Sequence, residues 1–361
     1  MKLVPVLLLV FCRIVCSYTA VAASLYNETM VFYAGDHPYL QYTGRIDFTE
    51  PEKPRAWAPG VYMQAKFRGT SCQVIIEDEI LYGNTHNYLE IIVDNWNPIR
   101  IQTKGKTDTI QVAQGLPDRE HIITICKNTE SGIGYIAFAG IICKQLLPLP
   151  PKLFRKMEFI GNSITCGSGM DLSVIPCDKG QWYDQHNAWL SYGPITARTL
   201  GAQWHLSAVS GIGLIRSCCN MNITMPQVYD KINMRADSVA WNSNDYHPDV
   251  ITVCLGQNDG VVDSVAFCSA YVQFLEKIRA YHPKATIICL ASPMANTTLN
   301  PVLQNYLTGI VSYMNNKGDK KISSYFFKKR YANGCGEHPD LKEHQQIAQE
   351  LIAYVRKVMK W

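Results

Sequence analysis

Apolar and polar residues alternate along the first part of the chain. Between residues 61 and 67 every second residue, starting with Val61, is a core-type residue, which is the period of a strand with one buried face. Further strand-like segments follow, separated by turn residues, at 72–78, 88–94, 109–113, 121–127 and 135–141. Many short strands without long helical patterns are typical of an all-β sandwich. We therefore predict a β-sandwich domain of jelly-roll type over residues 24–146.

The pattern changes at a proline-rich segment. Residues 147–152 contain Pro148, Pro150 and Pro151, which predict a stiff, extended linker. Beyond it, apolar strand-like segments lie at 156–160, 203–209, 249–255, 285–291 and 322–327. Segments of helical period lie between and after them, at 191–201, 264–281, 301–316 and 340–360. In the last of these, apolar residues from Ile347 to Met359 recur every four positions after a capping Asp340. This alternation predicts an α/β domain over residues 153–361, with a parallel sheet between two helical layers.

The N-terminus has the pattern of a signal peptide. Lys2 precedes an apolar segment, and Ala20-Val21-Ala22 fits a small-residue cleavage site, so residues 1–22 are expected to be removed on export. A buried first strand and a membrane anchor are the alternatives. An anchor needs about 20 apolar residues, and Arg13 interrupts this run. We predict a secreted, periplasmic or cell-surface protein with no stable membrane insertion.

Composition excludes some classes of partner. The chain has 361 residues, a formal net charge of +4 and no dense basic patch, so nucleic acid is not an expected partner. Thirteen cysteines are present, of which eleven remain once Cys12 and Cys16 leave with the signal peptide. None has zinc-site spacing, so no metal is predicted. Cysteines in apolar strands, such as Cys126, Cys143, Cys254 and Cys289, are interpreted as core residues. One or two disulfides fit an exported protein, but the pairing stays open.

Chemically capable residues follow the predicted strands of the α/β domain. Ligands of an open parallel sheet bind beyond the carboxyl ends of its strands. Ser163 follows the first strand, Gly211 the second, Asn258 the third and His338 the fifth. One sheet edge would thus collect a nucleophile, oxyanion donors and a general base, which are the parts of an acyl-transfer site.

The choice of histidine depends on topology. His247 and His282 come just before strands, which predicts that they lie at the opposite edge of the sheet. His344 falls inside the last helix and is interpreted as a surface or packing residue. Only His338 follows a strand and precedes a helix. Each motif alone is usually a structural turn, but the ordered set favours catalysis. A G-x-S-x-G nucleophile elbow is absent from the sequence.

Four sequence blocks resemble those of a known enzyme family. "FIGNSITCG", "SAVSGIG", "LGQND" and "GEHPD" are similar to the blocks of SGNH (GDSL-type) hydrolases, whose catalytic domain is three-layered and flavodoxin-like. In the first half, "GRIDF", "APGVYMQAKFRG", "IIVD" and "KNTE" resemble the N-terminal jelly roll of carbohydrate esterase family two. Members of that family are secreted two-domain enzymes that deacetylate plant polysaccharides such as xylan and mannan.

The resemblance implies a role for each block. Ser163 would be the nucleophile, and its backbone N–H one oxyanion donor. Gly211 would add a backbone N–H and Asn258 a side-chain N–H. His338 would take the serine proton and return it to the departing sugar hydroxyl. The implied substrate is an acetylated polysaccharide or oligosaccharide, and no metal or cofactor is implied.

The chain departs from the family pattern at two places. SGNH enzymes often carry an aspartate two or three positions before the histidine, where this chain has Gly336 and Cys335. This resembles members with a Ser-His dyad, in which backbone carbonyls orient the imidazole. Glu337 is a candidate orienting acid or substrate contact, although its position next to the histidine makes the geometry awkward. An aromatic residue often occupies that place, so Trp182 and Trp189 are candidate sugar platforms, with buried packing as the alternative for each.

Two other functions compete with the deacetylase hypothesis. One is an SGNH lipase or thioesterase, against which we find no long apolar lid segment. The other is a non-catalytic carbohydrate-binding protein, which would not need Ser163, Asn258 and His338. The sugar, the hydroxyl that carries the acetyl group and the oligomeric state stay open.

Overall fold

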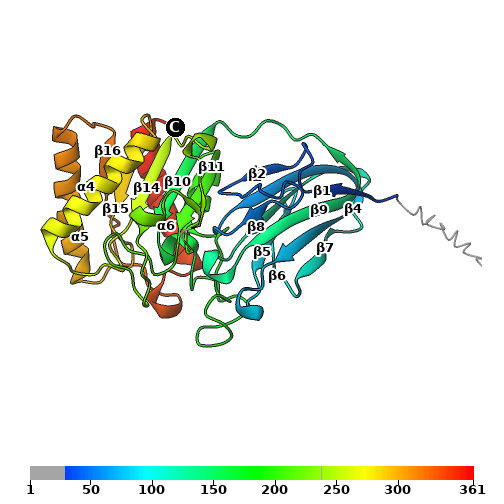
Figure 1. The fold of residues 1–361 in the computed structure, drawn as a ribbon, viewed down its shortest axis with the longest axis horizontal. Coiled ribbons are helices and arrows are strands. Elements are labelled where there is room, and N and C mark those ends of the chain that lie inside the picture. Colours follow the sequence, from blue (N-terminus) through cyan, green and yellow to red (C-terminus); the bar gives the residue numbers. More distant parts are fainter. Residues whose placement is uncertain (1–28, 237) are drawn as a thin grey trace, which may run out of the picture.

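The computed structural model describes residues 29–236 and 238–361. An antiparallel sheet from the first half of the chain and a parallel sheet from the second half lie side by side (Figure 1). The predicted signal peptide, residues 1–22, falls outside the described residues. Within them, no helix is long and apolar enough to cross a membrane.

Nine antiparallel strands form the N-terminal β-domain, in which the order β1-β9-β4-β8-β5-β6 is the main path. They are β1 Val31–Ala34, β2 Gln41–Thr43, β3 Arg55–Ala56, β4 Tyr62–Asp78, β5 Tyr88–Val93, β6 Ile99–Gln102, β7 Thr107–Ala113, β8 Arg119–Lys127 and β9 Ile136–Leu147. The all-β prediction is confirmed. The segments 61–67 and 72–78, however, form one continuous strand, β4, which pairs with β8 along its first part and with β7 along its second.

The second half is the predicted α/β domain. Its parallel strands are β10 Arg155–Gly161, β11 Ala202–Ala208, β14 Val250–Cys254, β15 Thr286–Leu290 and β16 Ile322–Tyr325. Their order, β11-β10-β14-β15-β16, is the flavodoxin-like 2-1-3-4-5 order. The helices are α1 Ser163–Cys166, α2 Tyr192–Thr199, α3 Met225–Val228, α4 Ser264–Tyr281, α5 Leu299–Asn316 and α6 Leu341–Met359. A small hairpin, β12 Lys231–Asn233 and β13 Ser238–Ala240, and the 3-10 helices η1 Leu81–Gly83, η2 Ser131–Ile133, η3 Ser243–Asp245 and η4 Cys335–Glu337 complete the fold.

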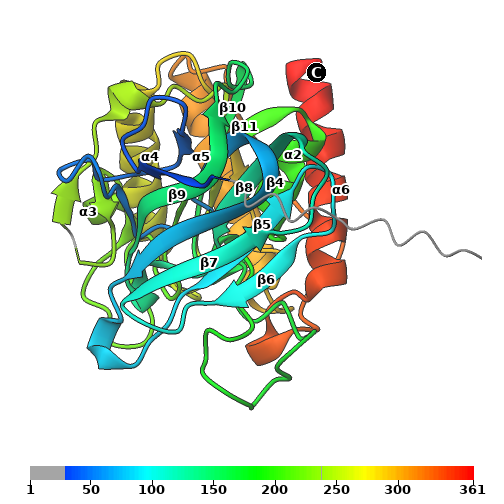
Figure 2. The same ribbon diagram turned by 90° about the vertical axis from the view of Figure 1, so that its right-hand side faces the viewer.

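Helices cover both faces of the parallel sheet. Ile251 and Val253 of β14 pack in one core with α4 and α5, while Val250 packs in another with α2 and α6. A strand buried on both faces needs apolar residues throughout, which explains why this segment reads as a continuous hydrophobic run. Figure 2 views the molecule from the β-domain side, with α2 and α6 on the opposite side from α4 and α5. The N-cap prediction for α6 is confirmed, because the Asp340 carboxylate accepts from the backbone N–H of Glu343 at 2.8 Å.

The two domains share a packed interface at β11, the edge strand of the parallel sheet. Tyr62 of β4 stacks on Trp204 of β11 with ring centroids 4.2 Å apart. The indole N–H of Trp204 also donates to the carbonyl of Gly60 at 2.9 Å. The outward face of β4 is therefore covered by the second domain at Tyr62, while Arg68 further along the same face is exposed.

A buried ion pair crosses the same interface. Arg45 of the β-domain donates to Glu158 of β10 at 3.1 Å, and both side chains are almost completely buried. Glu158 also accepts from Ser207 at 2.6 Å and from the Tyr229 hydroxyl at 3.0 Å. Arg45 donates in addition to the backbone carbonyl of Lys231 at 2.8 Å. The pair is satisfied only while both domains are docked.

We predict that Arg45→Met lowers the free energy of unfolding by about 3–5 kcal/mol, because it leaves the Glu158 carboxylate buried without its cation. The measurement is urea denaturation followed by tryptophan fluorescence. Adding Glu158→Gln should recover part of the loss. Lys317→Met, which removes an exposed ion pair with Glu276, is the control and should leave the midpoint unchanged. An unchanged midpoint in Arg45→Met would contradict the prediction.

Candidate active site

Ser163 lies at the carboxyl end of β10, at the first position of α1. The preceding Asn162 caps the helix by accepting from the backbone N–H of Ile164 at 3.3 Å. A side chain at Gly161 would lie 2.1 Å from the Thr165 hydroxyl, so the turn requires glycine there. The Gly-Asn pair thus forms the strand-to-helix turn that presents the serine.

His338 completes a hydrogen-bonded chain with Ser163. Its Nε2 lies 2.8 Å from Ser163 Oγ, and its Nδ1 lies 3.0 Å from the carbonyl oxygen of Cys335. A carbonyl can only accept, so Nδ1 carries the proton and Nε2 is free to accept from the serine hydroxyl. Burial lowers the pKa of His338, and the bond to the Cys335 carbonyl opposes that shift. The imidazole is therefore held in the tautomer and charge state of a general base.

The oxyanion candidates line the same cavity. Ser163, Gly211, Asn258 and His338 all border a space of about 690 Å³. Gly211 has φ of +81°, which residues with a side chain rarely adopt, and a Cβ there would lie a tight 3.0 Å from the Cys218 sulfur. The Asn258 amide is fixed by one N–H donated to the Ile212 carbonyl at 2.8 Å. A second cavity of about 470 Å³, beside His205 between the domains, contains none of these four residues.

Comparisons with known proteins place this arrangement in a family. Residues 42–150 match the family model of the carbohydrate esterase 2 N-terminal domain, and residues 159–318 match that of the GDSL-like lipase/acylhydrolase family. The chain is 30% identical to a family two carbohydrate esterase from Clostridium thermocellum, solved with cellohexaose. That match covers 89% of this chain and 99% of the other, with a TM-score of 0.82. The chain belongs to carbohydrate esterase family two.

Other relatives have informative names. Cellulase/esterase CelE of Acetivibrio thermocellus is 31% identical over 342 residues, which is 90% of this chain but only 40% of CelE. The chain thus spans less than half of that longer relative. An acetylxylan esterase / glucomannan deacetylase of Cellvibrio japonicus is 27% identical, with 94% of each chain covered. A solved family two esterase from the same organism has a TM-score of 0.83 at 24% identity, covering 92% of this chain and 99% of that one.

The three histidines that the sequence analysis of this family two esterase set aside lie where it predicts. His282 ends α4 just before β15, at the amino edge of the sheet, with its Nε2 3.7 Å from Glu158. His247 lies near it, with ring centroids 6.5 Å apart. His344 is buried and accepts from the backbone N–H of Tyr192 at 3.1 Å, so the packing interpretation is confirmed. Burial lowers the pKa of His344 to about 3.

The two candidate sugar platforms have different surroundings. Trp182 is 53% exposed and borders the cavity. Trp189 is buried, with the Arg198 guanidinium 3.9 Å above its ring and Trp204 against its edge. The platform interpretation is therefore wrong for Trp189, because the residue is buried and its ring packs against Arg198 and Trp204.

Glu337 points away from the imidazole. Its carboxylate pairs with Arg330 at 2.6 Å, and its side chain is 71% exposed. The acceptor for His338 Nδ1 is a carbonyl instead. Glu337 is therefore not the acid that orients the imidazole, because its carboxylate contacts Arg330 and a carbonyl accepts from Nδ1.

Glu130 of the β-domain is a site residue that the sequence analysis did not single out. It is fully buried and accepts from the backbone N–H of Ser210 at 2.5 Å and from the Cys166 thiol at 3.2 Å. These two donors belong to the loop before Gly211 and to α1. Burial is the main influence lowering the pKa of His338, and the charge of Glu130 opposes it. The sequence feature that could have pointed to Glu130 is the charged segment "KNTE", which comes directly after an apolar strand.

Two disulfides border the cavity. Cys177 is bonded to Cys335, and Cys218 to its neighbour Cys219. The predicted core cysteines are buried and take part in neither disulfide, which confirms that interpretation: Cys126, Cys143, Cys254 and Cys289. Among the described residues, no cluster of three His, Cys, Asp or Glu side chains could hold a metal ion.

We predict that Glu337→Gln retains kcat on p-nitrophenyl acetate within about tenfold, a barrier change of about 1.4 kcal/mol. The reason is that this carboxylate contacts Arg330 and not the imidazole. A small ester is used because it makes no sugar contacts. A loss approaching that of His338→Ala would make Glu337 a third catalytic member.

We predict that kcat/KM for the same ester rises with pH along one acid limb, with a midpoint below about 6.5, the ordinary pKa of histidine. Only the neutral imidazole can take the serine proton, and burial lowers the pKa of His338, so the active form persists to lower pH. His247→Ala, the control, should show an acid limb with the same midpoint as the wild-type enzyme. A midpoint above the ordinary value would show that a negative charge dominates the site.

Proposed function

We propose that this chain is an exported carbohydrate O-acetyl esterase that removes acetyl groups from plant polysaccharides or oligosaccharides of the xylan or mannan type. One observation carries the proposal: the hydrogen-bonded chain from Ser163 Oγ through His338 to the Cys335 carbonyl. The hydrogen-bonded Ser163 and His338 side chains border the cavity that Gly211 and Asn258 also line. Nucleophile, oriented base and oxyanion donors together are what acyl transfer requires.

The proposed reaction has two halves. Ser163 Oγ attacks the acetyl carbonyl carbon while its proton passes to His338 Nε2. The negative oxygen of the tetrahedral intermediate accepts from the N–H groups of Ser163, Gly211 and Asn258. The intermediate then breaks its bond to the sugar oxygen, which takes the proton from the imidazolium. Water, activated by the same imidazole, attacks the acetyl-serine and releases acetate.

The substrate class follows from the relatives and from the cavity rim. The relatives include an acetylxylan esterase / glucomannan deacetylase and an esterase solved with cellohexaose. Trp182 offers an exposed ring at the edge of the cavity. An aromatic face suits the apolar face of a sugar ring. The signal-peptide pattern of residues 1–22 is consistent with a substrate outside the cell, since polysaccharides do not enter it intact.

We predict that Ser163→Ala and His338→Ala each lose at least about 10³-fold in kcat while keeping the fold, since the two residues act as one unit. His247→Ala, at the opposite edge of the sheet, is the matched control and should remain active. The substrates are p-nitrophenyl acetate, p-nitrophenyl palmitate and acetylated xylan. The proposal expects turnover of both acetyl substrates and little of the palmitate.

Three outcomes would overturn parts of the proposal. Unchanged turnover in folded Ser163→Ala would remove the mechanism. A preference for p-nitrophenyl palmitate would indicate a lipase. Binding of acetylated xylan without turnover would indicate a carbohydrate-binding protein.

A further inference from the structure

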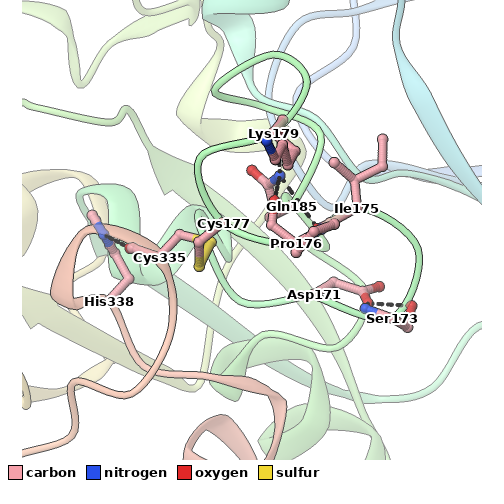
Figure 3. The surroundings of a disulfide bond; sticks show 9 residues. All are labelled: Asp171, Ser173, Ile175, Pro176, Cys177, Lys179, Gln185, Cys335 and His338. Atoms are coloured by element: carbon pink, nitrogen blue, oxygen red, sulfur yellow. Dashed lines mark hydrogen bonds between the residues drawn. A yellow bond between two sulfur atoms is a disulfide. The ribbon is translucent and has the colours of Figure 1, made fainter.

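A disulfide ties the loop after the nucleophile to the turn that carries the base. Cys177 and Cys335 are 158 residues apart in sequence, with Cα atoms 5.3 Å apart (Figure 3). Cys335 is also the residue whose carbonyl accepts from His338 Nδ1 at 3.0 Å. One residue thus carries both the covalent link and the acceptor that orients the imidazole.

The turn around Cys335 has an unfavourable backbone conformation. Gly336 has φ of +58° and Glu337 φ of +60°, both in the left-handed region. A residue with a side chain pays about 1–2 kcal/mol to adopt this conformation. Such a turn persists only where its surroundings determine it.

The backbone of the loop that follows the nucleophile lies against Cys335 and its carbonyl. The N–H of Cys335 donates to the carbonyl of Gly169 at 2.8 Å. Gly169 has φ of +67°, and a Cβ there would lie 2.7 Å from the Cys335 carbonyl oxygen. The loop and the turn are therefore in backbone contact, with no space between them for a methyl group.

The other end of the disulfide is firmly held. The side chain of Gln185 is buried and donates to the carbonyls of Ile175, Pro176 and Lys179 at 3.4, 3.2 and 3.1 Å (Figure 3). These three carbonyls surround Cys177 in sequence. An anchor fixed in this way can hold the turn, which a mobile loop could not.

We propose that the Cys177–Cys335 disulfide is a positioning element of the catalytic site: it holds the Cys335 carbonyl in the place from which that carbonyl orients His338 toward Ser163. The inference rests on the proposed function of the Ser163–His338 pair. Through a neutral carbonyl, the disulfide supplies the orientation of the imidazole that a buried carboxylate supplies in a catalytic triad, without the carboxylate's negative charge.

Two simpler roles would leave different signatures. A disulfide that only stabilises the fold would change the midpoint of denaturation without changing the catalytic constants of the folded enzyme. If the disulfide only places the loop that carries Cys177 and Trp182, its loss would raise KM for acetylated xylan and leave turnover of a small ester unaffected. A positioning role must instead appear in kcat for the small ester and in the titration of His338.

The decisive variant is Cys177→Ser, which breaks the link but leaves the catalytic turn unaltered in sequence. We expect kcat on p-nitrophenyl acetate to fall about 10- to 100-fold, as misplacement of a catalytic group does, with KM changed by less than about threefold. Because the carbonyl hydrogen bond raises the pKa of His338 against burial, loosening it should move the acid limb to lower pH. Cys268→Ser, a half-buried free cysteine on α4, is the control and should behave as wild type.

Two further variants separate the effect of the lost disulfide from the effects of the substituted side chains. Cys177→Ser with Cys335→Ser should match Cys177→Ser alone, because the link is already lost. Gly169→Ala keeps the disulfide but pushes on the Cys335 carbonyl, and should also lower kcat and shift the limb. This variant tests whether the position of the Cys335 carbonyl matters, on which the inference depends, if the cysteine variants do not fold.

The titration of His338 followed by NMR gives a readout that needs no turnover. The ring signal is assigned by its loss in His338→Ala, and its pKa should be lower in Cys177→Ser than in wild type. An unchanged pKa together with wild-type kcat would overturn the inference while leaving the proposed esterase intact. An inactive wild-type enzyme would overturn the proposed function, and the NMR pKa would then decide whether the disulfide positions the imidazole.

Discussion

The site depends on the hydrogen bond from His338 Nδ1 to the carbonyl of Cys335. This bond decides which ring nitrogen carries the proton, and therefore whether Nε2 can accept from Ser163 at 2.8 Å. A carbonyl has no net charge, so it orients the ring mainly by position. Its position comes from backbone contacts with Gly169, from a left-handed turn and from a disulfide. The aspartate of the family pattern is absent, and a carbonyl that the backbone holds in place accepts from His338 instead. The neighbouring Glu337 does not take this part.

The β-domain contacts the segments that carry the candidate site of the other domain. Glu130 follows β8 and accepts from the Ser210 N–H and the Cys166 thiol, so one buried carboxylate contacts both the loop before Gly211 and α1. Burial lowers the pKa of the nearby Lys127 to about 7, and its amine donates to the carbonyl of Thr129 at 2.7 Å. With the Arg45–Glu158 pair, which also crosses between the domains, these contacts tie the two domains together beside the candidate site, even though their sequence patterns differ.

Much of this could be predicted because it is encoded locally. Apolar periodicity located the strands of the parallel sheet, and the residues after those strands had to meet at one edge, which brought Ser163 and His338 together. Features that depend on particular side-chain contacts between distant segments, and not on the topology of the sheet, could not be predicted. The continuity of β4, the pairing of Cys177 with Cys335 and the burial of Trp189 all arise from residues more than one element away. Glu130 carried a local signal, a charged run after an apolar strand, but its target lies 80 residues further on.

The neutral acceptor has a consequence for the proton transfers of the proposed reaction. A carboxylate beside the imidazole would stabilise the imidazolium, which helps it to form but makes it a weaker acid. Around His338 burial dominates, and its pKa is lowered. Such an imidazole is a weaker base toward Ser163, but its imidazolium gives up a proton more readily. A sugar hydroxyl is a poor leaving group and needs that proton as its bond to the acetyl carbon breaks. The lowered pKa therefore favours the second transfer at some expense to the first, which suits a substrate whose departing oxygen is strongly basic.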